Sequence, residues 1–357
     1  IITSLQSIVQ MAALAYFQSY LPYLIIQTVG TQSYNLIITL IANKHYSFIN
    51  KKNPKRLPKN EIQALWKNVK SVTVYKLSGT LVNNTDNLVI TYFSGLGISG
   101  LASNYTLLIN TLNTLITQIF SALTASIGNL NAQSEIDRQF EFFGMLNLAN
   151  FWMYSWAALG ATFVSGDLVA LCFGTDYILD WKIPLMLSIN LYMVGMQNAV
   201  WTFKNTKGMF KYGQYILLFT AFLNVVGDIY LGQRWGVFGI FLATAIARLL
   251  TNTWYEPFAL FKYGFKKSPF LYLVKYTLYA FILCGEMMIC HFVCFFISFT
   301  PLINIIVKGL FCSLLSNAIF VFCFHNSKEY QYFKEIIERV IHILKAIPTK
   351  LKEKIFR

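Results

Sequence analysis

The sequence predicts an all-α polytopic membrane protein, and two observations carry this prediction. Apolar stretches of membrane-spanning length follow one another along the 357 residues, and every second connection between them is basic. The composition agrees, since 56% of the residues are hydrophobic, 12% are charged and the mean hydropathy is +0.51. A soluble domain carries about 25% charged residues, so the composition excludes an ordinary soluble class.

Ten apolar segments are long enough to cross hydrocarbon, which takes about 20 residues of helix. They lie near residues 1–17, 21–43, 71–93, 98–123, 143–164, 183–203, 212–232, 236–256, 270–298 and 302–324. Short turns separate several neighbours, such as Gly95–Gly97. The chain opens inside an expected helix with Ile1, so we expect that the N-terminus of a longer protein is missing.

Lysine and arginine are concentrated on one face of the expected topology. With residues 44–70 on the cytoplasmic side, that face carries 23 of the 29 Lys and Arg, and the opposite connections carry only Lys182 and Arg234. The positive-inside rule therefore predicts ten spans with both ends cytoplasmic. This topology and contact with anionic membrane lipids account for the net charge of +14, so no nucleic-acid partner is expected.

Two segments outside the spans have compositions of their own. Residues 44–70 are basic and contain Pro54 and Pro58, which predicts a cytoplasmic linker between two spans and the other eight. Residues 326–357 place apolar side chains at helical spacing among Lys and Glu, as in an amphipathic helix on the inner membrane surface. A solvated cytoplasmic tail is an equal alternative for these residues.

Ionisable side chains inside the spans are the first candidates for function, because a charge at mid-bilayer costs about 2.5–3.5 kcal/mol even on the mildest scale. Seven lie there: Lys76, Asp86, Asp228, Arg248, Lys275, Glu286 and Lys308. We expect Asp228 and Lys275 to reach the interface, whereas Lys76 either reaches it as well or lines a cavity. Asp86 and Arg248 lie deeper, and they either pair to hold helices together or line a polar cavity in which arginine engages phosphate.

Amide and hydroxyl side chains accompany Asp86 in sequence. Asn83 and Asn87 flank it, and the next span carries a broad polar face. We predict a cavity lined by Asp86, Arg248, Asn83, Asn87, Asn104, Asn110, Thr111, Asn113, Thr114, Gln118 and Lys76. Interhelical hydrogen bonding explains three or four of these residues, and so many uncharged donors and acceptors also suit sugar hydroxyls.

Other residues give weaker signals. Glu286 is, with Asp86, a candidate ion-coupling carboxylate, and Lys308 is a structural partner that it could pair with. The six cysteines and four histidines form no metal-ligand pattern, so no metal or cofactor is expected. No nucleophile elbow, zinc-protease motif or phosphate-binding glycine loop is present, and an enzyme is therefore not predicted.

Three stretches carry a family resemblance: TDNLVITYFSGLGISGLASNYTLLINTLNTLITQIFSALTASIGNL (85–130), TKGMFKYGQYILLFTAFLNVVGDIYLG (206–232) and WGVFGIFLATAIARLLTNTWYEPFALFKYGF (235–265). In these the chain resembles Wzx-type polysaccharide repeat-unit flippases of the multidrug/oligosaccharidyl-lipid/polysaccharide exporter superfamily. The resemblance implies a MATE-like helical bundle of two six-helix lobes. Residues 1–43 would be the last two helices of the N-lobe, 71–256 the C-lobe, 257–325 an additional helix pair and 326–357 the tail.

On this resemblance the protein exports undecaprenyl-diphosphate-linked oligosaccharides for capsule, O-antigen or cell-wall polysaccharide by alternating access in the bacterial cytoplasmic membrane. Its partners would be the lipid-linked glycan, membrane lipids, a glycan polymerase and other assembly proteins. About four N-terminal helices would be absent, so we expect no transport by this polypeptide alone. A drug/cation antiporter of the same fold is the first alternative. A polytopic glycan polymerase or acyltransferase is the second, and His291 alone does not supply its chemistry.

Overall fold

The computed structural model describes residues 2–46 and 58–346, in which every regular element is a helix. The helices of the first part and of the long segment that follows are α1 (Ile2–Phe17), α2 (Tyr20–His45), α3 (Lys59–Gln133), α4 (Ile136–Phe163), α5 (Ser165–Phe173) and the 3₁₀ turn η2 (Thr175–Tyr177). They are followed by α6 (Lys182–Gly195), α7 (Asn198–Thr206), α8 (Gln214–Leu250), α9 (Asn252–Ala259), the π-helical turn η3 (Leu260–Phe265), α10 (Phe270–Phe295), α11 (Pro301–Phe324) and α12 (Lys328–Ala346).

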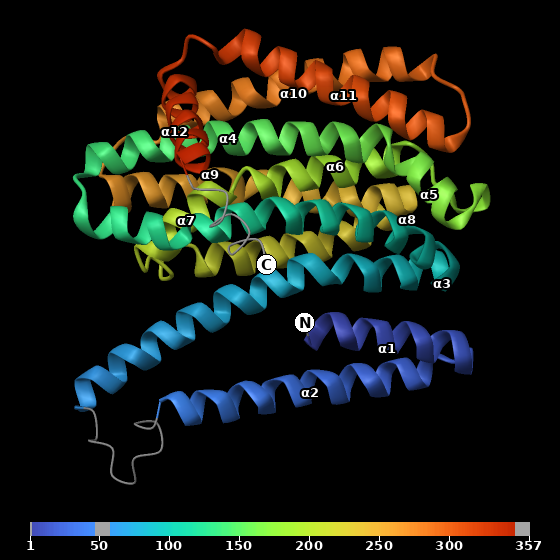
Figure 1. The fold of residues 1–357 in the computed structure, drawn as a ribbon, viewed down its shortest axis with the longest axis horizontal. Coiled ribbons are helices and arrows are strands. Elements are labelled where there is room, and N and C mark those ends of the chain that lie inside the picture. The colour runs from blue at the N-terminus through green and yellow to red at the C-terminus, as the bar shows by residue number, and fades with distance from the viewer. Residues whose placement is uncertain (1, 47–57, 347–357) are drawn as a thin grey trace. The chain divides into compact units, whose positions relative to one another are not determined.

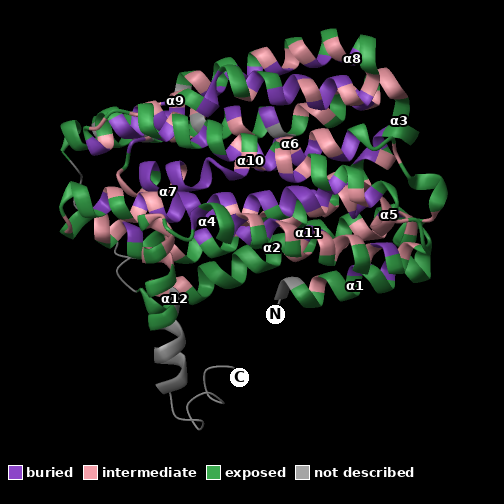
Figure 2. Ribbon diagram, turned by 90° about the horizontal axis from the view of Figure 1, so that it is seen from above, coloured by how far each residue is buried: buried purple, intermediate pink, exposed green. Residues whose placement is uncertain are grey.

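The chain divides into two compact units, residues 1–64 and 65–357. In the first unit, α1 and α2 form a hairpin that closes tightly at Gly30, where an added Cβ would lie 2.6 Å from the Cδ atom of Gln6. The Gln6 amide donates a hydrogen bond to the Gln27 carbonyl at 3.2 Å across the same crossing. Most residues of both helices are exposed (Figure 2), as expected of a hairpin whose apolar side chains face lipid.

Two of the long helices are hairpins rather than single rods. Gly95 in α3 has a φ of +81°, and the hydroxyls of Thr91 and Ser99 lie 2.8 Å apart across it. Gly236 in α8 has a φ of +57°, and a Cβ added at Gly227 would lie 3.0 Å from Cβ of Ala243. Glycine adopts positive φ without steric cost, so it permits both reversals. Each helix therefore has two antiparallel arms, residues 59–94 and 96–133 in α3 and 214–235 and 237–250 in α8.

The helices have the lengths and composition of membrane spans. Among the described residues six helical segments are long and apolar enough to cross a membrane, or seven if α4 and α5, which meet at 51°, form one bent span. Two of the six contain the reversals at Gly95 and Gly236. Helix α1 has only 16 residues and is not among the six. Each of the ten predicted spans thus coincides with a helix, a hairpin arm or a pair of consecutive helices.

Some predicted boundaries differ from the structure. The predicted linker 44–70 is shorter than expected, because α2 extends to His45 and α3 begins at Lys59; residues 47–57 lie outside the described part. After Pro58 the sequence Lys-Asn-Glu-Ile-Gln-Ala-Leu has no helix breaker and places Glu61 in the first turn, where the helix dipole favours it. The span predicted at 183–203 is divided into α6 and α7, and that at 236–256 into an arm of α8 and α9.

The second unit packs around α4, whose residues from Met145 to Phe151 are continuously buried. Its spans run side by side in Figure 1, with α10 and α11 along one edge and α12 crossing them. An aromatic cluster at one end joins four elements through ring contacts of 5.4–5.9 Å around Phe143. We call this the basic end, because the connections 206–213 and 262–270 that lie there carry Lys207, Lys211, Lys262, Lys266 and Lys267.

Opposite charges are paired at both ends of this unit. At the basic end the buried Lys204 ammonium donates to the Glu256 carboxylate and, at 2.6 Å, to the Tyr212 carbonyl. At the opposite end Lys308 lies 2.7 Å from Asp167, which also accepts a hydrogen bond of 2.8 Å from Asn304. The expected pairing of Lys308 with Glu286 is therefore wrong, because the bend between α4 and α5 brings Asp167 to the lysine.

The amphipathic helix predicted in the tail forms over residues 328–346 and packs against the bundle. Phe142 and Trp152 of α4 make ring contacts with Tyr332 and Phe333 at 6.5 and 5.9 Å. In Figure 1, α12 runs across the direction of the spans, an orientation that suits a helix in the plane of a membrane surface. Residues 347–357 of the predicted tail lie outside the described part of the chain.

Candidate functional site

A polar pocket of about 280 Å³ lies between both arms of α3, helix α6 and the second arm of α8. We call it the central pocket. Its lining combines amides, hydroxyls and one pair of opposite charges with a few apolar side chains. The lining residues are Asn84, Asp86, Asn87, Thr106, Ile109, Asn110, Asn113, Leu187, Asn190, Leu191, Val194, Phe241, Thr244 and Arg248.

The hairpin in α3 supplies most of the amides. Its first arm contributes Asn84, Asp86 and Asn87, and its second arm contributes Asn110 and Asn113, so the reversal at Gly95 brings together residues about 25 positions apart. The Asn113 carbonyl oxygen accepts a hydrogen bond of 2.8 Å from the Tyr154 hydroxyl. That hydroxyl in turn accepts from Asn198 at 2.6 Å. The chain of bonds fixes one end of Asn113 and leaves its amide N–H groups for other acceptors.

The guanidinium of Arg248 is held by an oriented asparagine. Its Nη1 donates to Asn190 Oδ1 at 3.2 Å, and Asn190 Nδ2 donates to the carbonyls of Phe241 and Met186 at 2.8 and 3.0 Å. Two carbonyl acceptors on the Nδ2 side of Asn190 define which end of the amide faces the arginine. A guanidinium has five N–H donors in a planar fork, and this anchor fixes the orientation of that fork beside the central pocket.

Beside the central pocket Asp86 meets a second carboxylate. Thr244 Oγ1 lies 3.1 Å from both Asp86 oxygens, and Asn224 Nδ2 lies 3.5 Å from Asp86 and 2.9 Å from Asp228. Asp228 and Asn224 are fully buried, and the two carboxyl groups are within hydrogen-bonding reach of each other. We call Asp86, Asn224, Asp228 and Thr244 the acidic cluster. It draws on three separate helical arms.

Acceptors outnumber donors in the acidic cluster. The threonine hydroxyl has a single proton, yet both Asp86 oxygens and the Ile240 carbonyl, at 3.2 Å, lie within its reach. Two further oxygens, Asn224 Oδ1 and Asp228 Oδ2, are buried and have no hydrogen-bond partner among the described residues. Buried acceptors without donors are costly, so the arrangement favours binding of an additional positive species.

The donor set indicates which species fits. The oxygens that face this species come from carboxylate, amide, hydroxyl and carbonyl groups. Such oxygens suit a proton or a hard cation rather than a soft transition metal. Within the described residues no group of three His, Cys, Asp or Glu side chains could hold a metal ion. With two carboxylates and the Arg248 charge attracted to Asp86, the acidic cluster has the charge balance to bind one proton or one monovalent cation.

The structure brings together only part of the residue set that the sequence nominated. Asp86, Asn87, Asn110, Asn113 and Arg248 line the central pocket. The side chain of Asn83 lies outside the described part. The remaining candidates do not line the central pocket: Lys76, Asn104, Thr111, Thr114, Gln118 and Glu286.

These outlying residues have other surroundings. Thr111 and Thr114 are exposed and donate to carbonyls of their own helix at 2.8 and 2.7 Å, so they follow a different face of the second α3 arm. Glu286 is buried in α10 with 1% of its surface exposed, and its Oε2 atom has no partner among the described residues. It is not among the residues that form the acidic cluster.

Among the polar residues of the site, the set predicted from the sequence does not include six: Asn84, Thr106, Asn190, Asn224, Asp228 and Thr244. The expectation that Asp228 reaches the interface is wrong, because the hairpin of α8 turns only at Gly236, two turns further on, and encloses Asp228 completely. A signal was available in the spacing. Asn224 and Asp228 are four residues apart on one helix and therefore share a face, as do Thr244 and Arg248.

The fold and the central pocket define the class of protein: an all-α, multi-pass membrane protein with a polar site inside one helical unit, as the sequence predicts. The chain matches no family model and no curated protein. Its fold is similar to the solved structure of lipid II flippase MurJ, inward closed conformation, with a TM-score of 0.51 and 15% sequence identity. The match covers 90% of this chain and 66% of that chain, just under two thirds of its length.

Proposed function

We propose that this chain is part of a transporter that moves a lipid-linked oligosaccharide precursor across a bacterial cytoplasmic membrane. The observation that carries the proposal is Arg248, a guanidinium anchored by Asn190 in a membrane-embedded pocket among amide side chains. A charged side chain at that depth is costly and usually marks a substrate or ion pathway. The similarity in fold to a lipid II flippase supports a lipid-linked cargo.

The chemistry of the central pocket suits the two polar parts of such a cargo. A diphosphate offers oxygens to the planar fork of the Arg248 donors, and sugar hydroxyls can both donate to and accept from Asn84, Asn87, Asn110 and Asn113. The volume of about 280 Å³ lies just below the usual range of ligand pockets, about 300–1,000 Å³, so the pocket suits a polar part of the cargo rather than the whole molecule. It therefore accommodates the diphosphate and an adjoining sugar, while the lipid tail stays in the bilayer.

The domain assignment is part of the same proposal. Helices α1 and α2 (residues 1–43) are the last two helices of a first lobe, residues 71–256 form a second six-helix lobe, and residues 257–325 add a helix pair. Cargo moves as the two lobes alternately open the site to each side. Capsule, O-antigen or cell-wall repeat units are the cargo classes, with a glycan polymerase and other assembly proteins as partners.

The acidic cluster supplies the coupling ion site in this proposal. Its two orphaned oxygens, Asn224 Oδ1 and Asp228 Oδ2, would meet a proton or a monovalent cation together with Asp86 and Thr244. Binding there neutralises Asp86 and so changes the charge that Arg248 experiences next to the central pocket. Without that neutralisation Asp86 would repel the diphosphate. The second nominated carboxylate, Glu286, is a separate candidate in α10.

The test of the proposed cargo site is an Arg248→Ala exchange in a strain that depends on this gene for polysaccharide export. A charge-assisted hydrogen bond contributes about 1.5–3 kcal/mol, so we expect export to fall at least about tenfold at unchanged protein level in the membrane. Arg248→Lys keeps the charge but loses the planar fork of donors, so its export should lie between that of the wild type and that of Arg248→Ala. Arg234→Ala, at an exposed arginine that stacks on Tyr230, is the matched control. Unchanged export by Arg248→Ala would remove the arginine from the site.

The test of the ion site is Thr244→Val, which keeps the shape of the side chain and removes the hydroxyl. In proteoliposomes that contain the whole transporter, transport of a lipid-linked oligosaccharide by this variant should require a higher ion concentration for its half-maximal rate. Sodium at fixed pH and pH without sodium distinguish a cation from a proton. Thr202→Val, at a hydroxyl that bonds to the carbonyl of Asn198 in its own helix, is the control. An unaltered ion dependence in Thr244→Val contradicts the assignment.

The drug/cation antiporter alternative is tested by the same Arg248→Ala variant. A cationic drug entering the central pocket meets the Arg248 charge, and removal of that charge should favour its binding. Increased drug export together with normal polysaccharide export would therefore support the antiporter instead.

A further inference from the structure

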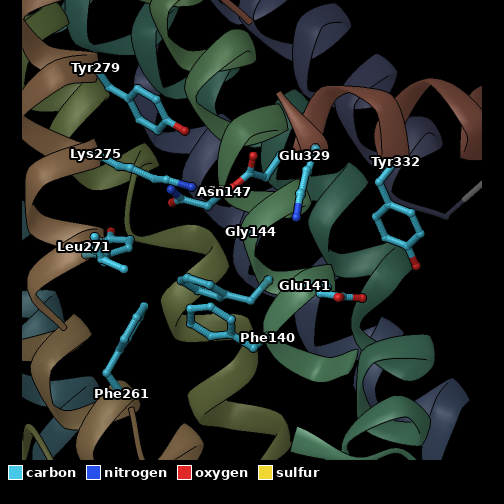
Figure 3. Close-up of a pocket in the computed structure, with 13 residues that line it drawn as sticks. Phe140, Glu141, Gly144, Asn147, Phe261, Leu271, Lys275, Tyr279, Glu329 and Tyr332 are labelled. Carbon is cyan, nitrogen blue, oxygen red and sulfur yellow. Dashed lines mark hydrogen bonds and ion pairs between the residues drawn. The ribbon is translucent and has the colours of Figure 1, made fainter. Parts of the chain in front are cut away.

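A second cavity, of about 350 Å³, opens at the basic end between the first turns of α4, α10 and α12 (Figure 3). We call it the basic-end cavity. Its walls are aromatic, with Phe140 and Phe143 from α4, Phe261 from η3, and Tyr272 and Tyr279 from α10. It is separate from the central pocket, with which it shares no lining residue.

The basic-end cavity lies at the depth of lipid headgroups. Along α10 it extends from Leu271, in the first turn, to Tyr279, which is about 12 Å at the rise of an α-helix. Along α4 it extends from Phe140 to Asn147, also within the first turns. Both helices begin at the basic end, so the cavity occupies the outermost part of the membrane on that side. By the positive-inside rule this is the inner leaflet.

One deeply buried polar group in this cavity lacks a partner. Asn147 has 3% of its surface exposed, and its Oδ1 atom has no hydrogen bond among the described residues. Figure 3 shows Asn147 beside the pair of Lys275 and Glu329 at the cavity. An orphaned carbonyl oxygen at such a site requires an N–H or O–H donor from outside the chain.

The charges around the basic-end cavity are balanced. Lys275 and Glu329 form an ion pair between α10 and α12, which leaves Glu141 and Lys328 at the rim. Gly144 lies against this pair, since a Cβ there would be in van der Waals contact, at 3.4 Å, with Cγ of Glu329. One acidic and one basic group, with an acceptor between aromatic walls, complement a ligand that carries both an ammonium and a phosphate.

We propose that the basic-end cavity binds the headgroup of an inner-leaflet aminophospholipid, with its primary ammonium at the Asn147 carbonyl oxygen and its phosphate at Lys328, while the Glu141 carboxylate adds a negative charge at the rim. The acyl chains extend past Leu271, which is exposed on the outer surface of α10. A phosphatidylethanolamine headgroup supplies the N–H donors that Asn147 lacks. A choline headgroup has the same charges but no N–H donor, and a glycerol headgroup has no positive charge. The lipid would join α12 to α10.

The test is lipid retention by the purified full chain, measured by native mass spectrometry after equilibration with an equimolar mixture of phosphatidylethanolamine, phosphatidylcholine and phosphatidylglycerol. We expect ethanolamine lipid to be enriched at least about fivefold over each of the others. Asn147→Leu and Glu141→Gln should each reduce the enrichment at least about threefold. Lys334→Gln, at an exposed residue on α12 outside the cavity, should leave it unchanged.

Two outcomes would overturn the proposal. Equal retention of the ethanolamine and choline lipids would show that no N–H donor is recognised, and preference for phosphatidylglycerol would show an anionic lipid site instead. The Glu141→Gln variant provides an independent reading if Asn147→Leu does not fold, because Glu141 is exposed at the rim. Wild-type enrichment in Glu141→Gln would likewise contradict the proposal, because it would show that the negative charge at the rim is not recognised.

Discussion

Charged groups are arranged differently at the ends and in the middle of the second unit. At the ends two buried or half-buried ion pairs join different helices, Lys204 with Glu256 and Lys308 with Asp167. In the middle two carboxyl groups, Asp86 and Asp228, lie together, and the nearby arginine donates to an asparagine. The ion pairs at the ends connect helices, whereas the middle has more negative than positive charge, which a bound cation would balance.

This contrast separates two roles for polar residues in a membrane bundle. A buried ion pair need not add net stability, but removal of one partner strands the other. A cluster with an excess of acceptors is destabilising by itself, and such arrangements are typical of functional sites. Replacing a charged residue by a neutral one should therefore lower the thermal stability at the ends and should not lower it in the middle.

The largest effect is expected for Lys204→Met at the basic end. The change leaves the Glu256 carboxylate buried without its cation, which typically costs about 3–5 kcal/mol. We expect a clear loss of thermal stability in detergent, measured by the temperature at which the monodisperse peak in size-exclusion chromatography disappears. The double variant Lys204→Met with Glu256→Leu should recover most of the loss. A single variant as stable as the wild type would mean that this end is not held by the pair.

A smaller loss is expected for Lys308→Met at the opposite end. The side chains of Lys308 and Asp167 retain 15% and 16% exposure, so water offsets part of the penalty, and Asn304 still donates to Asp167. The expected cost is about 1–3 kcal/mol in the same assay. A loss of stability as large as that of Lys204→Met would contradict the expectation that a more exposed ion pair costs less to break.

The opposite sign is expected for Asp228→Asn in the middle. The amide removes one of two adjacent carboxylates and relieves like-charge repulsion of about 1 kcal/mol or more. The variant should therefore be at least as thermostable as the wild type, while the ion dependence of transport is lost. A marked loss of stability with retained ion dependence would place Asp228 among the structural residues.

The smallest effect concerns pH and the half-exposed pair of Lys275 and Glu329. Burial is the largest single influence and would raise the pKa of Glu329, but the hydrogen bond from Lys275, a backbone hydrogen bond and the charges of Lys275 and Lys328 together outweigh it and hold the pKa below its ordinary value of 4.5. A lowered carboxyl pKa stabilises the folded contact above pH 4.5, and this contribution disappears as the pH falls through the folded pKa. Amide hydrogen exchange in α12, corrected for its intrinsic pH dependence, should therefore increase at low pH.

The control for that measurement is Glu329→Gln, which has no titrating group at this position. Its exchange in α12 should be faster at neutral pH and should vary less between neutral and low pH. Identical pH profiles in the two proteins would show that another group controls the docking of α12.

The fold could be predicted well from the sequence, because span length, turn glycines and the distribution of lysine act locally. Asp86 and Arg248 could be nominated for a similar reason, since a charge inside an apolar helix is unusual whatever surrounds it. The partners of these residues could not. Asp228 was expected at an interface because the distance from a helix end does not reveal whether a neighbouring arm covers that end.

It was harder to assign uncharged polar residues to one face of a helix than to identify charged residues inside a span. The second arm of α3 carries hydroxyls and amides almost all round, and the sequence alone could not distinguish Asn110, in the central pocket, from Thr114, which bonds to its own helix. Lys308 was assigned to Glu286 by position, whereas the bend between α4 and α5 supplies Asp167 instead. Such pairings depend on tertiary geometry that hydropathy does not encode.

The hairpin of α8 couples the acidic cluster and the central pocket mechanically, because one of its arms carries residues of both. Thr244 of the acidic cluster and Arg248 of the central pocket lie one turn apart on the same arm, about 6 Å along its axis. The other arm carries Asn224 and Asp228, and Gly227 sets the contact between the arms against Ala243. An axial turn of the second arm that withdraws Thr244 from Asp86 must also swing Arg248 relative to Asn190. In the proposed transporter, release of the ion and weaker binding of an anionic cargo would then occur together, without a relay of side chains between them.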